Sequence, residues 1–253
     1  MRIFLKTEDE IILLRAASQL ATRALIEVGR HEVPRLALSH LRNKVVNAVM
    51  RTVPTESNSG KEALSSDTEF TFFVNGAYIE PSLEGECMLC EGDWLTVNCW
   101  VCLDGYYSFG AHTFIVGSSQ DDEPLTSTLR DMLRQVVRRA SAGHSIKEMS
   151  RTVYSLHSHD PYVLQKTFGH GVGRNRVENP ILRMNPGVND TVLLKEGMCL
   201  VIALAFKHGR SHFIKPRLMH ESTFHNPFVP FGTTVVVRPG RPEILTSFET
   251  IVK

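Results

Sequence analysis

The chain has 253 residues, 42% of them hydrophobic, and its 28 basic and 27 acidic side chains leave a formal net charge of +1. A chain of this length and apolar content can bury its own core, so we expect a single domain over residues 1–253. A nearly balanced charge gives no basis for a partner held by bulk electrostatics, which argues against nucleic acid and against a membrane surface.

The N-terminal residues and the cysteines indicate the cellular compartment of the protein. Residues 1–17, MRIFLKTEDEIILLRAA, interleave charges with apolar residues and do not resemble a signal peptide, and no later run reaches about 18 apolar residues. Five cysteines are an odd number in a chain that needs no covalent staples. We therefore expect a cytoplasmic protein with reduced thiols.

The first half of the chain predicts two helices followed by β-structure. Thr7 and Glu10 have the spacing of a capping box, and apolar residues then recur at helical spacing, which predicts a helix over about 8–29. A second helix is expected over about 33–52, and the polar stretch 52–67 is typical of an exposed loop. Strands are expected from Glu69, with Asp104-Gly105 as the turn of a hairpin.

The second half repeats this order. Helices are expected over about 124–141 and 145–157, followed by a β-rich region with turns at Asn185-Pro186 and Pro239-Gly240. Two helix pairs, each followed by strands, indicate pseudo-duplicated halves over about 1–120 and 121–253.

Residues 87–102 read CMLCEGDWLTVNCWVC and contain two C-x-x-C pairs, a spacing typical of zinc sites. Residues three apart in a strand point to opposite faces, so Cys99 and Cys102 cannot chelate one ion without breaking the strand. Cys87 and Cys90 flank a loop and need ligands from elsewhere to hold a metal. Free thiols are the expectation for all four, with no role assigned to them.

Five phrases occur in order along nearly the whole chain: TEDEIILLRAA, EGDWLTVNCWVCLDGYYSFGAHTFIVG, FGHGVGRNRVENP, LKEGMCLVIALAF and TTVVVRPGRPEILT. Together they resemble the methionine aminopeptidases and their pita-bread-fold relatives, which include prolidase, creatinase and non-peptidase binding domains. The resemblance implies an α+β fold, in which a curved antiparallel sheet is covered by two helix pairs.

The same resemblance locates the metal ligands of the family. Its metal-dependent members hold two cations with two Asp, one His and two Glu, and these positions fall on Asn98, Phe109, His170, Ala203 and Gly232, the last with Phe231 or Thr233 as neighbouring choices. One imidazole and one amide do not offset the charge of two divalent cations. We therefore expect no metal, no other cofactor and no metal-dependent aminopeptidase activity.

Other positions of the resembling site also differ. Glu80 stands where the family has a substrate-contacting His, Arg176 where it has a pocket aromatic, and Val177 where it has a catalytic His. Glu221 lies in a stretch, MHESTFHNPF, that often lines the cleft in the family.

Strand alternation adds aromatic residues to this list. Trp100 is expected on the same face as Asn98, and Tyr107 and Ala111 on the same face as Phe109. The position that corresponds to the family's metal site is therefore expected to be aromatic and largely uncharged. It is either an open pocket or a pocket filled by Phe109 and Trp100.

The first functional hypothesis is a metal-independent enzyme that uses acid–base chemistry on a small polar substrate, either derived from an amino acid or bearing a carboxylate. His170 and Glu80 are its catalytic pair, Asn98 donates a hydrogen bond, and Arg176 holds an anion. Tyr107, Trp100, Phe109 and Glu221 complete the substrate-binding set. The reaction is then a lyase, isomerase, cyclase or C–N hydrolase reaction, with a biosynthetic role left open.

The second hypothesis is a catalytically inactive relative of the aminopeptidases that binds a peptide or protein partner in the cleft. Small or apolar residues such as Phe109 and Ala203 fit this reading. Each candidate also has a purely structural interpretation: His170 as a relic in a glycine-rich turn, Glu80 as a solvent-facing carboxylate, and Arg176 in an ion pair with Glu178 or across the sheet. The expected partner is a small molecule or a short peptide, and the expected state is a monomer or a homodimer.

Overall fold

A computed structural model describes residues 2–53, 64, 66–117, 124–157, 163–164, 166–185, 192–207 and 228–247. Its centre is a ten-stranded sheet with the order β2-β1-β3-β4-β9-β8-β6-β7, in which β10 pairs with β9 and β5 with β8. The strands are β1 (Glu69–Val74), β2 (Ala77–Tyr78), β3 (Trp94–Leu103), β4 (Tyr106–Ile115), β5 (Val163–Leu164), β6 (Thr167–Gly171), β7 (Glu178–Arg183), β8 (Cys199–Lys207), β9 (Phe228–Val236) and β10 (Glu243–Ile244). Neighbouring strands run antiparallel.

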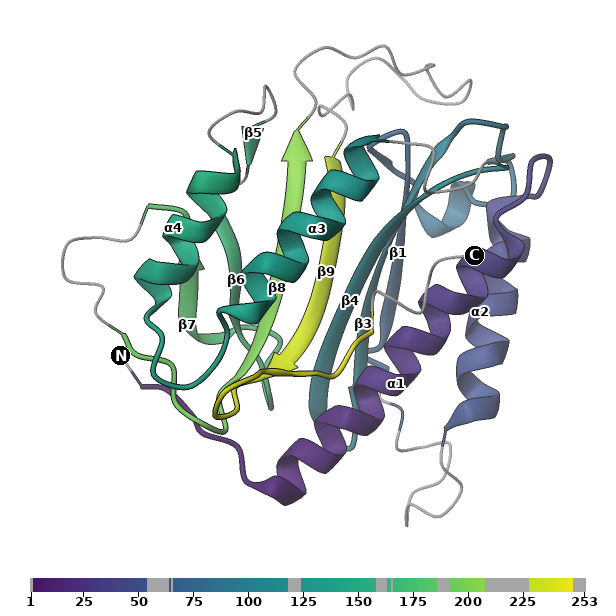
Figure 1. The fold of residues 1–253 in the computed structure, drawn as a ribbon. Coiled ribbons are helices and arrows are strands. Elements are labelled where there is room, and N and C mark those ends of the chain that lie inside the picture. Colours follow the sequence, from purple (N-terminus) through teal and green to yellow (C-terminus); the bar gives the residue numbers. More distant parts are fainter. Residues whose placement is uncertain are drawn as a thin grey trace.

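Helices cover one face of this curved sheet (Figure 1). They are α1 (Glu8–His31), α2 (Leu38–Thr52), α3 (Pro124–Arg138) and α4 (Ile146–His157), with a short 3₁₀ helix, η2, at Pro81–Leu83. In Figure 1, α1 lies beside β3 and β4 with α2 next to it, and α3 and α4 lie over the strands of the second half. The expected α+β pita-bread architecture is confirmed.

The hydrophobic core lies between this helical layer and the sheet. Alternate residues of β3, namely Val97, Cys99 and Val101, belong to it and are fully buried. Because side chains alternate along a strand, Asn98 and Trp100 point away from the helices. We call the sheet face that carries Asn98, Trp100, Phe109 and His170 the site face.

Helix α1 begins where its sequence predicts. The Thr7 hydroxyl accepts a hydrogen bond from the Glu10 amide at 3.3 Å, and the Thr7 amide donates to the Glu10 carboxylate at 3.0 Å, which completes the capping box. The helix runs through the buried Gly29 to His31, two residues beyond the expected end. None of the helices in the described ranges is long and apolar enough to span a membrane.

The remaining helix boundaries shift for local reasons. Helix α2 begins at Leu38 and not near residue 33, because the intervening chain turns at Arg35, whose φ is 68°. Helix α3 ends at Arg138, after which the amides of Arg139 and Ala140 bond three residues back, to Val136 and Val137. Such tightening is common where an α-helix ends.

The predicted hairpin is present and sets the register of the site. Asp104 and Gly105, with φ of 48° and 77°, form the turn between β3 and β4, as expected for two residues that both need positive φ. The register pairs Trp100 with Phe109 and Asn98 with Ala111. The two halves of the chain meet between β4 and β9, in register at Ala111 and Gly232. Their origin by duplication stays a prediction.

A buried ion pair fixes the N-terminal segment to the second half of the sheet. Lys6 Nζ lies 2.6 Å from Glu178 Oε2, and the two side chains are only 4% and 5% exposed. The Lys6 amide also donates to the Gly197 carbonyl at 2.7 Å, and Glu178 accepts a further bond from the Asn175 amide at 3.2 Å. Glu178 therefore pairs with Lys6, and not with Arg176.

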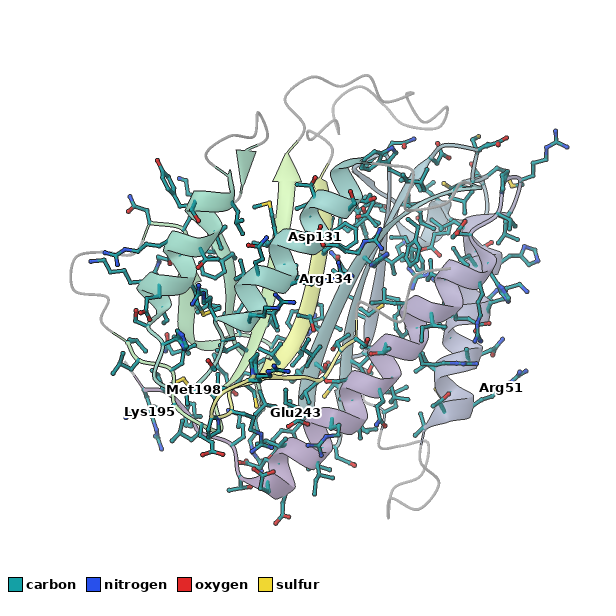
Figure 2. The ribbon with its side chains drawn as sticks, in the orientation of Figure 1. Arg51, Asp131, Arg134, Lys195, Met198 and Glu243 are labelled. Carbon is teal, nitrogen blue, oxygen red and sulfur yellow. The ribbon has the colours of Figure 1, made fainter. Side chains whose placement is uncertain are left out.

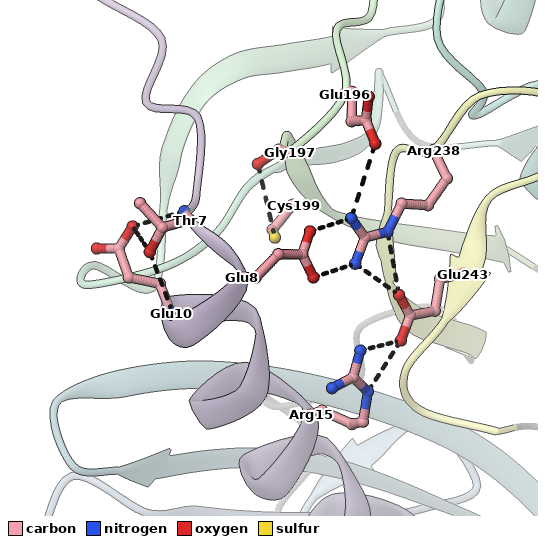
Figure 3. A network of polar contacts seen from close by, with 9 residues as sticks. All are labelled: Thr7, Glu8, Glu10, Arg15, Glu196, Gly197, Cys199, Arg238 and Glu243. Carbon is pink, nitrogen blue, oxygen red and sulfur yellow. Dashed lines mark hydrogen bonds and ion pairs between the residues drawn. The ribbon is translucent and has the colours of Figure 1, made fainter.

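A second, more exposed network joins α1 to the end of the sheet (Figure 3). Arg238 donates to Glu8 and to Glu243, and Arg15 donates to the same Glu243 carboxylate at 2.6 Å. Glu196 lies 3.9 Å from Arg238. These contacts connect the first turns of α1 to the turn between β9 and β10.

All five cysteines are described and none is in a disulfide. Cys99 and Cys102 lie in β3 with opposite orientation, and burial raises the pKa of the Cys99 thiol well above its usual range. Burial also raises the pKa of Cys87 to about 11. The thiols of Cys87 and Cys99 are therefore neutral at physiological pH and unsuited to act as nucleophiles.

Candidate functional site

The sheet brings the five positions of the resembling metal site together. Asn98 pairs with Ala111, Ala111 with Gly232, and Gly232 with Ala203, so these residues form one row across β3, β4, β9 and β8. His170 joins the row from β6, where it pairs with Val201 of β8. Phe109 lies beside the row, two residues before Ala111 on β4 and on the same face. The ligand assignment itself stays a prediction.

The side chain of Phe109 fills the middle of the row. Its Cε1 atom lies 2.7 Å from the place that a Cβ atom on residue 232 would take, and the Ala203 Cβ lies 3.1 Å from the same place. Phe109 itself is 8% exposed, and its ring centroid is 4.7 Å from that of Trp100. Of the two alternatives for this pocket, filling by aromatic side chains is the one that these contacts favour.

Asn98 has a polar atom without a partner. Its Oδ1 is buried, and no hydrogen bond from the described residues reaches it. A buried carbonyl oxygen left unpaired costs about 1–3 kcal/mol, so its retention calls for a reason. The sequence predicted Asn98 as a hydrogen-bond donor, whereas the atom that the structure leaves open is an acceptor.

His170 is held as a neutral imidazole. Its Nδ1 lies 2.8 Å from the Gly171 carbonyl oxygen, which only accepts, so Nδ1 carries the proton and Nε2 is an acceptor. Burial lowers the pKa of His170 and outweighs the opposing effect of that backbone bond. The ring stacks on Trp100 with centroids 6.1 Å apart and planes inclined by 10°.

Arg176 and Tyr107 form a rim beside these rings. The guanidinium donates to Glu69 at 2.8 Å and to the Asp67 carbonyl at 2.5 Å, and it lies 5.7 Å from the ring centroids of both Trp100 and Tyr107. The Tyr107 hydroxyl donates to the Asp67 carboxylate at 2.6 Å, and this bond raises the pKa of Tyr107 to about 12. The ion pair across the sheet is thus present, and the role of Arg176 as an anion clamp stays a prediction.

Sequence reasoning missed Asp67 and Glu69, which hold this rim. The cross-strand register could have identified them, because Glu69 lies opposite Trp100 on the strand next to the site. A carboxylate at that position lies within reach of a cation stacked on the Trp100 ring.

The other predicted residues lie apart or outside the described ranges. Glu80 is exposed and caps the 3₁₀ helix η2, and no contact in the described part of the chain joins it to His170. Val177 is 58% exposed. Glu221 lies outside the described residues.

The residues in the row do not fit a pair of divalent cations. Phe109, Ala203 and Gly232 have no ligand atoms, which leaves one imidazole nitrogen and one amide oxygen. Within the described ranges, no group of three or more His, Cys, Asp or Glu side chains could hold a metal ion. Two-metal sites need carboxylates that bridge the ions and offset their charge.

The sequence model of metallopeptidase family M24 matches residues 12–239. The chain belongs to this family. It is 29% identical to methionine aminopeptidase from Helicobacter pylori over 220 residues, which are 83% of this chain and 85% of that protein. It is 25% identical to methionine aminopeptidase from Borreliella burgdorferi over 254 residues, 97% and 98% of the two chains.

The fold agrees with this assignment. The crystal structure of methionine aminopeptidase from Thermotoga maritima superposes with a TM-score of 0.77 at 21% identity, covering 97% of this chain and all of that one. The resemblance read from the sequence phrases is therefore confirmed for the family and for the fold.

These comparisons overturn the function expected from the sequence. A metal-independent lyase, isomerase, cyclase or C–N hydrolase was expected first and an inactive binding relative second, but the relatives found are named methionine aminopeptidases. The prediction was wrong because an expected loss of metal ligands argues against one mechanism without indicating another. The charged side chain offered as a substrate clamp, Arg176, is also bound by the protein's own acceptors.

Proposed function

We propose that this M24-family protein recognises a peptide at the site face, reading its amino-terminal end. The curated relatives are named methionine aminopeptidases, a name that denotes a peptide ligand with a free amino terminus. The family site is also the place where the described residues offer both unused polar atoms and aromatic surface.

The observation that carries the proposal is the buried, unpartnered Oδ1 of Asn98. A peptide amino group or backbone N–H is a donor, and a ligand that displaces the side chains covering this oxygen would remove its cost on binding. The Nε2 atom of the neutral His170 is a second acceptor on the same face. These two acceptors select for a donor and give no support to an anionic ligand.

Aromatic surface supplies the apolar part of the ligand site. The half-buried Trp100 stacks against His170 and Phe109 and presents its remaining surface on the site face. An apolar first side chain of a peptide packs well on such rings. The side chains described here bind and orient a peptide, and we derive no hydrolytic step because they do not fit the pair of cations.

A fluorescence titration tests the proposal. The chain has two tryptophans, so Trp94→Phe leaves Trp100 as the only reporter. The tripeptide Met-Ala-Ser should change its fluorescence saturably, and the N-acetylated tripeptide should bind roughly tenfold or more weakly, about the worth of one charge-assisted hydrogen bond. Equal binding of both peptides, or no saturable change, would refute recognition of the amino terminus.

The same samples test the metal-ligand assignment. Manganese or cobalt should leave the affinity for Met-Ala-Ser unchanged, because the row lacks the bridging carboxylates that hold a pair of cations. Binding that tightens when the metal is added would show that the ligand assignment is wrong while leaving peptide recognition intact.

A further inference from the structure

A pocket of about 580 Å³ lies between the C-terminal end of α3 and the turn that joins β9 to β10. It is on the helix-covered side of the sheet, away from the site face. Its walls combine three arginines with three apolar residues: Arg134, Arg138, Arg241, Val137, Pro242 and Ile244. Figure 2 labels Arg134 on α3 and Glu243 near the turn below it. Its volume is within the range typical of small-ligand sites.

The positive charge of this pocket is only partly neutralised. Arg134 pairs with Asp131, one turn earlier on α3, at 2.6 Å. Arg138 and Arg241 have no carboxylate partner in the described part of the chain. Arg138 and Arg241 thus contribute a local charge of +2, and no acidic side chain is among the described residues that line the pocket.

The nearest carboxylate along the chain is turned away from the pocket. Glu243 is held by Arg15 at 2.6 Å and by Arg238 at 3.1 Å, in the network of Figure 3. Strand alternation in β10 then directs the next residue, Ile244, to the opposite side, where it lines the pocket. The same local structure that removes a negative charge therefore supplies an apolar wall.

The apolar residues give the pocket a floor and a rim. Val137 is 2% exposed and lies at the base, whereas Ile244 is 41% exposed at the edge. An exposed apolar side chain such as Ile244, beside Arg138 and Arg241, is suited to a ligand that is anionic at one end and apolar at the other.

We propose that this pocket binds a small phosphate monoester whose organic part is apolar or aromatic. A phosphate monoester carries about −1.5 to −2 charges at pH 7, which matches the local charge of the pocket. Guanidinium groups bind phosphate oxygens through paired hydrogen bonds, and the apolar wall covers the ester group. The pocket is separate from the site face, so this inference does not depend on peptide recognition.

Calorimetric titration of the full chain with phenyl phosphate tests the proposal. Phenyl phosphate should bind with a Kd of about 1 mM or below, inorganic phosphate roughly tenfold more weakly, and phenol without saturation. The Arg138→Ala/Arg241→Ala double variant should lose at least about tenfold in affinity for phenyl phosphate. Both arginines are exposed, so the variant should unfold at the same temperature as the parent chain.

Arg139→Ala is the matched control. Arg139 follows Arg138 in the sequence and is equally classed as exposed, but it does not line the pocket. It should leave the affinity for phenyl phosphate unchanged. An equal loss of affinity in this control would mean that binding depends only on the net charge of the protein, which would overturn the proposal. Binding should also weaken below about pH 6, where the monoester takes up its second proton. The absence of saturable binding, or unchanged affinity in the double variant, would overturn the proposal as well.

Discussion

At the scale of single residues, the site face combines an unsatisfied acceptor with a filled cavity. Asn98 Oδ1 is buried without a partner, His170 is neutral with one nitrogen tied to Gly171, and Phe109 occupies the space beside Gly232. These three features have different physical signatures, and substitutions at each can be told apart.

Asn98→Leu should raise the free energy of unfolding by about 1 kcal/mol while it abolishes peptide recognition. Leucine has a similar size and lacks the unpaired carbonyl oxygen, so the free-energy cost of burying that oxygen disappears from the folded state. Urea unfolding and the Trp100 titration measure the two effects. A variant that is destabilised and still binds Met-Ala-Ser would contradict the role given to this oxygen.

His170 should make stability fall in mild acid. Its pKa is lowered in the folded protein, so below about pH 6.5 the unfolded chain takes up a proton that the folded chain does not bind. The free energy of unfolding therefore decreases from about pH 6.5 down to the folded pKa and levels off below it. His170→Gln should lose this part of the slope in urea unfolding at about pH 7.5 and 5.5; identical slopes would rule out the shift.

Gly232→Ala should cost about 1–3 kcal/mol of stability, because the new Cβ would lie 2.7 Å from the Phe109 ring. Phe109→Leu should recover part of the loss by shortening the opposing side chain. Gly85→Ala is a suitable control, since a Cβ there meets nothing within 4 Å. Equal thermal unfolding of the two alanine variants would mean that Phe109 does not fill this space.

At the scale of elements, the N-terminal segment is held by a single buried charge pair. Lys6 lies before α1 and Glu178 begins β7, so the pair joins segments separated by 172 residues. It also orders the loop after His170, because Glu178 accepts from the Asn175 amide. A weakened pair should therefore affect both the N-terminal segment and the rim of the site.

Lys6→Met should destabilise the protein by about 3–5 kcal/mol, because Glu178 is then buried without its partner. Lys6→Met/Glu178→Leu should be much closer to the parent chain, since no charge is left in the apolar environment. Denaturant unfolding of both variants gives the comparison. If the double variant were no better than Lys6→Met, the loss would come from packing of the lysine stem.

At the scale of the whole molecule, the metal-ligand assignment requires five strands to be placed correctly. A variant carrying Asn98→Asp, Phe109→Asp, Ala203→Glu and Gly232→Glu restores the family's set around His170. Manganese at about 100 times its Kd should stabilise this variant by about 2.7 kcal/mol, and should leave the parent chain unchanged. The result is read from thermal unfolding, and a parent chain that is stabilised equally would contradict the assignment.

The fold was largely predictable from local signals. The capping box at Thr7, the Asp104-Gly105 turn and the helical spacing of apolar residues each act within a few residues, so the elements that they specify are present. Boundaries such as the start of α2 were less predictable, because a turn at Arg35 with positive φ has no strong signal in a non-glycine residue. Of the candidate site, the row of positions was predictable and the bonding of its side chains was not.

The sequence by itself determined the family and the order of the elements, because these depend on residue identity at fixed spacing. Only the tertiary structure decided what each side chain does. It paired Arg176 with Glu69 in place of Glu178, left Asn98 Oδ1 without a partner, and turned Glu243 away from a pocket of arginines. Partners, burial and charge balance depend on contacts between residues far apart in the chain, and spacing along the sequence does not encode those contacts.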